Sequence, residues 1–549
     1  FGGHHIAPGG ALLEECPFID YLIHGEGEEA FKRLLLCAAG LEVPSETAGI
    51  SYRTENGTVT TPNEVCTAGE VIDYPSPYLN GYFDKILEEN KDLTFMGLIE
   101  TTRGCPNSCS YCDWSNMKSR IRKFPLERVF GEIDWISEHR IYGLGSADSN
   151  FGIFERDEHI TDYIIKKFLE NGYPRGYQTS YAKNSNERIF RIGCKLEKYH
   201  LSKGITLSFQ SMDEKTLENI GRKNISVENY RELMDMYNAA GISTYTELIL
   251  GLPGETYESF TAGIERLLML GQHNSIYIHN CEWLPCSMMG TPGYTEKYRI
   301  KTARLPLNQP HIEEDNSDGI PEYSRLVIST CTMTEKDWIN MNLFSFTVQC
   351  FHHTGLFQLF ALYLYNEKKV GYGDFYKKTL SWLFLSDNAA SRVIRGIKDR
   401  LTDIVNGVEG AGFVAQDERF GKVRWPFEEY LFLCCVWELD AFYDDAEKFL
   451  AGFFDGDTVF PELMRFQRAM IKRPFNKETE IVSAYDFEDY FLNALENKRV
   501  PLKKEKHTTA LHAVYYDDWS FYAKKVVWFG RKENRNIYLG ENGERSEEK

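Results

Sequence analysis

The segment Cys105-Pro-Asn-Ser-Cys109-Ser-Tyr-Cys112 closely follows an apolar run at residues 95–101 and brings three cysteines into one short loop. Gaps of three and two residues let a single loop wrap three corners of a cubic iron-sulfur cluster. A 4Fe-4S cluster that only transfers electrons usually takes four thiolates, yet the next cysteine along the chain is Cys194. The spacing therefore predicts a cluster with one iron open to a substrate or cofactor.

A zinc site is the alternative for the same loop, because Cys109 and Cys112 have the spacing of a zinc-binding pair. A structural zinc site normally closes with four ligands, and nothing near the loop supplies a second pair. We therefore predict the cluster and keep zinc as the alternative.

Around this loop, β-rich apolar runs alternate with helical patterns. Six runs predict strands, at residues 95–101, 141–147, 177–182, 205–209, 244–250 and 276–280. The helical patterns between them lie at residues 126–139, 158–169, 186–199, 227–240 and 257–270. Each is long enough to cross over a parallel sheet, so the order predicts a partial (β/α)6 barrel of the α/β class. In such barrels the chemistry lies at the C-terminal ends of the strands, where the cysteine loop begins.

Three domains are expected, at residues 1–80, 81–300 and 301–549. The first is a smaller α/β piece that ends in the stiff linker Tyr74-Pro-Ser-Pro-Tyr78, because each proline fixes its own φ and restricts the residue before it. The third is mainly helical and rich in aromatic residues.

Two stretches of this third domain carry specific predictions. Residues 338–366 lack charged side chains, but polar residues interrupt them, which favours a buried helix or helical pair over a membrane span. Apolar runs at residues 511–516 and 525–538 predict a strand pair.

The composition narrows the classes of partner. The formal charge of -19 disfavours non-specific binding to nucleic acid or to an anionic membrane. Thirteen cysteines are an odd number and too sparse for a disulfide scaffold, and no secretory segment opens the sequence, which favours the reducing cytoplasm. The sequence starts at Phe1 as if inside a domain, so we expect a missing N-terminal part.

The pattern Cys-x-x-x-Cys-x-aromatic-Cys after the first strand of a β/α barrel resembles the radical S-adenosylmethionine (radical SAM) superfamily. The resemblance covers residues 95 to about 290 and includes Leu248-Ile-Leu-Gly-Leu-Pro-Gly-Glu-Thr256. It implies that Cys105, Cys109 and Cys112 bind a 4Fe-4S cluster whose open iron holds the amino and carboxylate groups of SAM. Reductive cleavage of SAM, with electrons from a flavodoxin- or ferredoxin-type reductant, would give a 5'-deoxyadenosyl radical that takes hydrogen from carbon.

The resemblance also implies residues that contact SAM. They are polar or aromatic residues at strand ends and in loops: Tyr111, Asp148, Asn150, Ser208, Gln210, Arg222 and Glu247. Tyr111 would lie against the adenine, and Arg222 would meet the SAM carboxylate. Asp148 and Asn150 stand where the superfamily usually has a Gly-Gly-Glu-type segment. The polar residues have a plainer alternative, which is to satisfy nearby backbone groups or to serve as surface charges.

The N-terminal piece carries Phe1-Gly-Gly-His-His5 and His24-Gly-Glu-Gly-Glu-Glu29, which look like the end of a doubly wound cobalamin-binding domain. For Glu28 alone, stabilisation of the following helix N-terminus explains the residue as well. The order of modules implies a cobalamin-dependent C-methyltransferase for a small-molecule or peptide-derived substrate that the C-terminal domain selects. The alternatives are a radical rearrangement, cyclisation or oxidation without methyl transfer, and a non-catalytic iron-sulfur electron-transfer protein.

Overall fold

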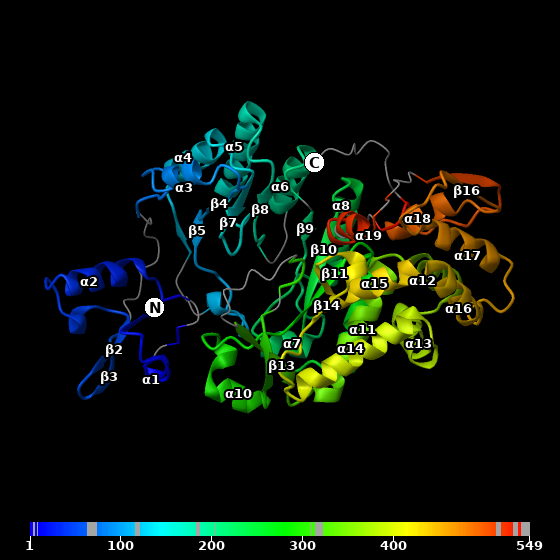
Figure 1. The fold of residues 1–549 in the computed structure, drawn as a ribbon. Coiled ribbons are helices and arrows are strands. Elements are labelled where there is room, and N and C mark those ends of the chain that lie inside the picture. The colour runs from blue at the N-terminus through cyan, green and yellow to red at the C-terminus, as the bar shows by residue number, and fades with distance from the viewer. Residues whose placement is uncertain are drawn as a thin grey trace. The chain divides into compact units, whose positions relative to one another are not determined.

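The computed structural model describes residues 1–3, 6–7, 9–62, 74–115, 121–182, 187–202, 204–307, 309–312, 322–511, 516, 518–530 and 536–539 (Figure 1). The chain packs into two compact units. Unit 1 comprises Phe1–Ser202, Glu218–Lys223 and Glu282–Ile300, and unit 2 comprises Lys203–Leu217, Asn224–Cys281 and Lys301–Lys549. Each unit contains one three-stranded parallel sheet with its crossover helices, so the fold is α/β. The three domain boundaries expected from the sequence stay a prediction.

Unit 1 opens with the small α/β piece that the sequence predicts. Its elements are α1 (Ala11–Glu15), β1 (Tyr21–Ile23), α2 (Glu28–Ala38), β2 (Ile50–Thr54) and β3 (Gly57–Thr60). The three strands form an antiparallel sheet in the order β1-β2-β3. The guanidinium of Arg53 donates to the carbonyls of Leu13, Pro17 and Ile19, which ties the first helix and its exit to the sheet.

The parallel sheet of unit 1 confirms the first three predicted strands. It runs β4 (Met96–Ile99), β7 (Gly143–Ser146) and β8 (Tyr177–Gln178), with helices α4 (Leu126–Glu138), α5 (Glu155–Asn171) and α6 (Glu187–Lys198) between and after the strands. Figure 1 shows α4 and α5 beside this sheet. A Cβ on Gly97 of β4 would lie 2.8 Å from Cδ1 of Ile136, so glycine lets α4 pack closely against the strand. Leu144 and Ile164 share the same buried core.

The parallel sheet of unit 2 confirms the other three strands. It runs β9 (Ile205–Thr206), β10 (Thr244–Leu250) and β11 (Ile276–Asn280), with helices α7 (Glu214–Asn219), α8 (Val227–Ala239) and α9 (Tyr257–Met269). The sequence did not predict the short helix α7. The hydroxyl oxygens of Ser226 and Thr256 accept from backbone N–H groups three residues on, which fixes where α8 and α9 begin.

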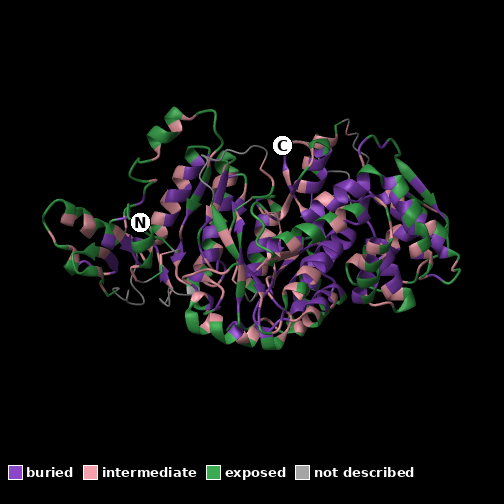
Figure 2. Cartoon of the chain, turned by 60° about the horizontal axis from the view of Figure 1, so that its bottom comes forward, coloured by how far each residue is buried: buried purple, intermediate pink, exposed green. Residues whose placement is uncertain are grey.

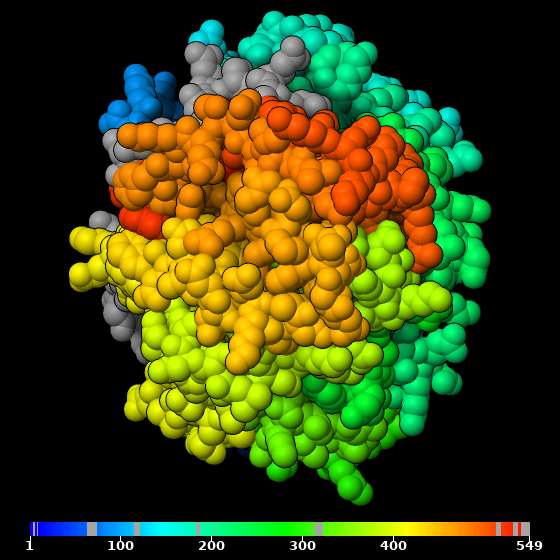
Figure 3. All heavy atoms as spheres, turned by 90° about the vertical axis from the view of Figure 1, so that its right-hand side faces the viewer, coloured from blue at the N-terminus to red at the C-terminus, as the bar shows by residue number. Residues whose placement is uncertain are grey.

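The rest of unit 2 is mainly helical, as predicted. Its elements are β12 (Lys301–Pro306), β13 (Tyr323–Ser329), α11 (Glu335–Val348), the π-helical turn η4 (Gln349–His353), α12 (Gln358–Lys368), α13 (Tyr372–Leu385), α14 (Ala389–Val405), β14 (Val414–Gln416), β15 (Arg424–Pro426), α15 (Phe427–Trp437), α16 (Leu439–Ala451), α17 (Val459–Met470), β16 (Glu480–Ser483), α18 (Phe487–Leu495), β17 (His507–Ala510) and α19 (Trp519–Tyr522). Yellow to orange residues of this region make up much of the face in Figure 3.

Two predictions for this region have opposite outcomes. The uncharged stretch forms the helical pair α11 and α12, and every residue from 341 to 364 is buried. Figure 2 colours buried residues purple. The second strand of the pair expected near the end is wrong where the structure describes it, because residues 525–528 belong to the π-helical segment Ala523–Trp528. Residues 512–515 and 531–535 of the expected pair lie outside the described residues. No helix in the described ranges is both long enough and apolar enough to cross a membrane.

Candidate active site

The cysteine loop begins at the end of a two-residue strand, β5 (Thr102–Arg103), which pairs with β6 (Arg122–Lys123). Cys109 is buried, and Cys105 and Cys112 are partly exposed. Backbone from two other segments holds the loop: Ser110 N–H donates to the Ile220 carbonyl at 2.9 Å, and Met289 N–H donates to the Ser110 carbonyl at 2.8 Å. The loop backbone is therefore fixed on both sides by main-chain hydrogen bonds.

A glycine allows the closest of these approaches. Gly221 has a φ of +65°, and a Cβ at this position would lie 3.1 Å from the Ser108 carbonyl oxygen. A larger residue would therefore be strained in its own backbone and would crowd the cysteine loop.

Asn150, predicted as a site residue, lies directly at one of the cysteines. Its side-chain Nδ2 donates to the Cys105 sulfur at 3.2 Å, and Nδ2 of Asn107 lies 3.7 Å from the same sulfur and 3.4 Å from Oδ1 of Asn150. Asn150 is buried. An N–H group that points at sulfur stabilises the thiolate, which is the form that binds metal.

Asp148 is held by groups at the ends of two strands. Its buried carboxylate accepts five hydrogen bonds, from the N–H and hydroxyl groups of both Thr101 and Thr102 and from the Ser146 hydroxyl, at 2.6–3.1 Å. These bonds join the segment that follows β4 to the end of β7. Because both oxygens are already used, the geometry favours a positioning role, and contact with SAM stays a prediction.

Tyr111 and Arg222, far apart in the sequence, meet beside the loop. Nη1 of Arg222 lies 3.3 Å from the Tyr111 hydroxyl and donates to it, and the Arg222 guanidinium is buried. Burial raises the pKa of the Tyr111 phenol well above its usual value, so the tyrosine stays neutral. A buried guanidinium beside a neutral phenol is suited to binding a carboxylate.

In unit 2, the three remaining predicted residues lie together: Ser208 and Gln210 follow β9, and Glu247 lies in the middle of β10. The Ser208 hydroxyl donates to Oε2 of Glu247 at 2.7 Å, and Gln210 N–H donates to the Glu247 carbonyl at 2.9 Å. Gln210 has a φ of +65°, which is uncommon for a residue other than glycine. The three residues thus form one group, and their contact with SAM stays a prediction.

Comparison with known proteins identifies the family of this protein. The radical SAM superfamily profile matches residues 99–267. The chain is 34% identical over 525 residues, 91% of its own length and 76% of the relative's, to the cobalamin-dependent radical SAM methyltransferase TokK of Streptomyces tokunonensis. The protein belongs to the radical SAM superfamily, among its cobalamin-dependent methyltransferases. It is also 34% identical over 496 residues to the 2-(S-pantetheinyl)-carbapenam-3-carboxylate methyltransferase of Streptantibioticus cattleyicolor, with coverage of 86% and 72%.

Among solved structures, the cobalamin-dependent SAM radical enzyme OxsB, with aqua-cobalamin and SAM bound, matches with a TM-score of 0.43 at 13% identity, covering 83% of this chain and 68% of that one. Family membership confirms the predicted radical SAM fold and enzyme class. The electron-transfer protein kept as an alternative is therefore not favoured.

The donor set fits the iron-sulfur cluster of this superfamily. A cubane cluster takes each thiolate on a different iron, whereas a single ion needs its ligands to converge on one point. Within the part of the chain that the structure describes, no three His, Cys, Asp or Glu side chains converge in this way. The three cysteines with the N–H group of Asn150 at one sulfur suit a cluster better than zinc, and the cluster and SAM are the cofactors of this superfamily.

An ion-pair network that the sequence did not predict precedes the first cysteine of this radical SAM enzyme. Arg103 lies 3.0 Å from Glu26, 2.8 Å from Glu28 and 2.7 Å from Glu100, and Arg122 also pairs with Glu26. Burial alone would lower the pKa of the Arg103 guanidinium, but Glu100 and Glu28 raise it above its usual value. Glu28 therefore does more than stabilise a helix end.

A cavity of about 280 Å³ within unit 1 lies beside this network. Residues 25–28 line it together with Glu100, Thr102 and the first residues of the cysteine loop, Arg103 and Gly104. The sequence shows both the Gly-Glu-Gly-Glu stretch and the cysteine loop as motifs. It does not predict that the two motifs lie side by side.

Sequence reasoning also missed a buried acid in unit 2. Glu255 follows the turn after β10 and accepts from the hydroxyls of Ser211 and Ser259, both at 2.6 Å. Burial raises the pKa of this carboxyl to about 7, although the two hydroxyls act against the shift. Its ionisation is thus set near neutral pH.

Proposed function

We propose that this chain transfers a methyl group to a carbon centre of a small carboxylate-bearing molecule, with a 4Fe-4S cluster, SAM and cobalamin as cofactors. When bound, the cluster and SAM would supply a radical that abstracts a hydrogen atom from carbon, and cobalamin would supply the methyl group. The three-cysteine loop with the Asn150 N–H group at Cys105 is the observation that carries the proposal. The similarity to TokK, a cobalamin-dependent methyltransferase, and to the 2-(S-pantetheinyl)-carbapenam-3-carboxylate methyltransferase supports it.

The chain's own residues divide this task. Cys105, Cys109 and Cys112 hold three irons, and the loop is kept in place by the backbone of neighbouring segments. The buried Arg222 guanidinium attracts the SAM carboxylate. The Ser208–Glu247 pair offers acceptor oxygens for the ribose hydroxyls or the SAM ammonium group.

The cavity in unit 1 supports the cobalamin part of the proposal. Residues 25–28, which resemble the end of a cobalamin-binding domain, share its lining with Arg103 and Gly104 at the start of the cysteine loop. The ion pairs of Arg103 with Glu26 and Glu28 keep the two segments together. We infer that these residues set the position of the cobalamin domain relative to the loop.

The substrate class follows from the relative's name. That enzyme acts on 2-(S-pantetheinyl)-carbapenam-3-carboxylate, a small thioether with a carboxylate. We propose a substrate of the same chemical class, rather than a peptide, and a low-potential flavodoxin- or ferredoxin-type reductant. The thiolates and the open cluster require the reducing conditions of the cytoplasm, where we place the protein.

Anaerobic reconstitution tests the proposal. The full-length protein is given cobalamin, a reductant, SAM labelled with deuterium in its methyl group, and 2-(S-pantetheinyl)-carbapenam-3-carboxylate, and the products are measured by mass spectrometry. We expect 5'-deoxyadenosine together with a product that carries the labelled methyl group, both absent in Cys109→Ala. An altered product without label would instead show rearrangement, cyclisation or oxidation. A reduced cluster without any 5'-deoxyadenosine would contradict the proposal.

A further inference from the structure

Helix α14 of unit 2 carries a glycine between two arginines on its exposed face. Arg392, Gly396 and Arg400 follow one another at intervals of four residues, so they lie on one stripe of the helix, and all three are exposed. Glycine inside a helix is destabilising relative to alanine. A Cβ on Gly396 would meet no atom of the described residues within 4 Å. Packing within the protein therefore does not explain the glycine, and space beside it stays open between two guanidinium groups.

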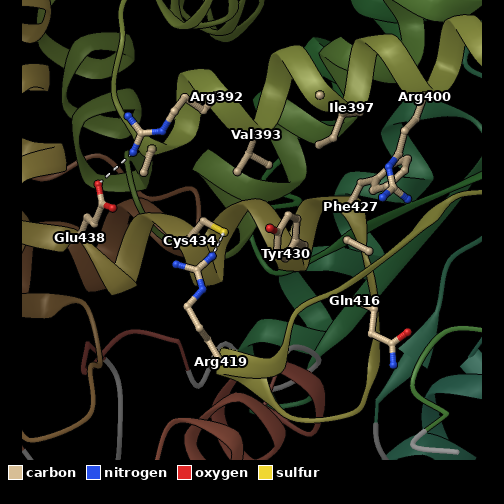
Figure 4. Close-up of a pocket in the computed structure, with 13 residues that line it drawn as sticks. Arg392, Val393, Ile397, Arg400, Gln416, Arg419, Phe427, Tyr430, Cys434 and Glu438 are labelled. Carbon is tan, nitrogen blue, oxygen red and sulfur yellow. Dashed lines mark hydrogen bonds and ion pairs between the residues drawn. The ribbon is translucent and has the colours of Figure 1, made fainter.

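This open space belongs to a cavity of about 400 Å³, here named the α14 pocket (Figure 4). It lies between α14, α15 and the β14–β15 hairpin, entirely within unit 2. Its residues are Ala389, Arg392, Val393, Gly396, Ile397, Arg400, Ala415, Gln416, Arg419, Phe427, Tyr430, Cys434 and Glu438. In Figure 4, Val393 and Ile397 extend from α14 toward Tyr430 and Cys434 of α15. An apolar floor is thus bordered by arginines.

The charges of the α14 pocket are only partly balanced. Arg419 pairs with Asp417 at 2.6 Å, and Arg392 lies 3.3 Å from Glu438 with both groups largely exposed. Arg400 donates to the Val414 carbonyl at 2.9 Å, and no described carboxylate lies within ion-pair distance of it. Three guanidinium groups against two carboxylates make this a positive site on a chain whose net charge is -19.

We propose that the α14 pocket binds a small organic anion whose apolar body lies against Gly396 and Ile397 and whose carboxylate or phosphate group is held by Arg392 and Arg400. The planar fork of a guanidinium matches both groups, and the volume is that of a small-molecule site. Burial raises the pKa of the Cys434 thiol to about 12, so this sulfur adds no competing negative charge. The proposal is independent of the methyl transfer proposed above.

The test uses simple probes on the full-length holoenzyme. Phenyl phosphate and phenylacetate offer the two anionic groups on the same kind of apolar body, and benzyl alcohol is the neutral control. Binding is measured by calorimetry or by ligand-observed NMR. We expect at least one anion to bind at millimolar concentration or below and benzyl alcohol to bind about tenfold more weakly or not at all. Which anion binds more tightly distinguishes a phosphate from a carboxylate ligand.

Matched variants locate the binding. Gly396→Leu adds a side chain to the pocket from a position where a Cβ meets no described atom within 4 Å, and Arg400→Gln removes a guanidinium that carries no described ion pair. Each is expected to weaken anion binding about tenfold. Lys398→Gln removes an exposed cation from the same helix outside the pocket, and it should change binding by less than about twofold.

Thermal melting guards against unfolded variants. Gly396→Ala should raise the melting temperature, because alanine is the better helix former, while it weakens anion binding. The proposal is overturned if neither anion binds to the wild type, if benzyl alcohol binds as tightly, if Gly396→Leu binds normally, or if Lys398→Gln loses binding as much as Arg400→Gln does. Each of these results would show that Arg392, Gly396 and Arg400 form only a solvated helix face.

Discussion

The cysteine loop of unit 1 and the α14 pocket of unit 2 are built in contrasting ways. The loop takes all three of its predicted cluster ligands from one short stretch, and backbone from distant segments holds it in place. The α14 pocket takes its residues from two helices and a hairpin spread over residues 389–438, with no local motif. A cluster motif common to the family is thus visible as one short sequence pattern. A ligand pocket of this kind forms only when separate helices pack together.

The two regions also treat charge differently. Next to the loop, Arg103 is surrounded by three carboxylates, and Asp148 by five donors. In the pocket, the Arg400 guanidinium donates to a backbone carbonyl and lies over the Phe427 ring, and no described carboxylate pairs with it. Satisfied groups fix a geometry, while partly satisfied guanidinium groups remain available to a ligand. Changes near the loop should therefore alter cofactor chemistry and leave anion binding in the pocket unchanged.

The largest effect is expected from Cys109→Ala. This removes one of three iron ligands, and cluster assembly fails, because a three-cysteine site has none to spare. Iron content and 5'-deoxyadenosine formation should fall to background, measured by metal analysis and mass spectrometry. Phenyl phosphate or phenylacetate binding should match that of the wild type. Retained cluster with full activity would show that the loop is not the cluster site.

The next effect concerns Arg103. Replacement by Gln leaves Glu26, Glu28 and Glu100 close together without their shared cation, which should destabilise unit 1 by about 3 kcal/mol. Denaturant unfolding followed by far-UV circular dichroism measures this. Lys85→Gln is the matched control, since Lys85 pairs with Glu89 at the surface and should contribute almost nothing. Equal effects of the two variants would contradict the central role of Arg103.

Much of the fold was predictable from the sequence, because each parallel strand is a local apolar run and each crossover helix has its own periodicity. The second strand expected near the end was wrong, where it is described, for a physical reason. Val526 and Val527 have high strand propensity, but both are buried in the π-helical segment Ala523–Trp528, and such packing overrides propensity.

The candidate site was predictable where a motif carries it and not where distant parts meet. The three cysteines are evident from spacing alone. The contact of Asn150 with Cys105 is seen only in the structure, and the predicted contact of Asn150 with SAM stays a prediction. The pairing of Arg103 with Glu26 joins residues 77 positions apart, and no single-sequence pattern reports that contact. The α14 pocket depends on an open space beside Gly396, which only coordinates can reveal.

A smaller effect, dependent on pH, is expected at Glu255. Its folded-state pKa of about 7 lies above the usual value of 4.5, so the folded protein holds this proton more tightly than the unfolded chain. Stability from this group is complete below pH 4.5 and is lost as the pH rises through about 7, by about 3 kcal/mol at most. Glu255→Gln should remove this loss, and Glu258→Gln, exposed on α9, should not. Identical melting profiles between pH 5 and pH 8 for wild type and Glu255→Gln would contradict the assignment.

The smallest effect tests how finely the cysteine loop is tuned. Asn150→Ala removes the N–H group at 3.2 Å from the Cys105 sulfur without removing an iron ligand. The cluster should assemble, but its reduction potential should fall by about 40 mV, the one-electron equivalent of a hydrogen bond worth roughly 1 kcal/mol. Redox titration followed by electron paramagnetic resonance measures the shift. Asn107→Ala, whose amide is 3.7 Å from the same sulfur, should shift the potential less. A larger shift of the reduction potential in Asn150→Ala than in Asn107→Ala would show that these two side chains tune the potential of the cluster. Equal potentials in the wild type and both variants would show that the two side chains only help to hold the loop backbone.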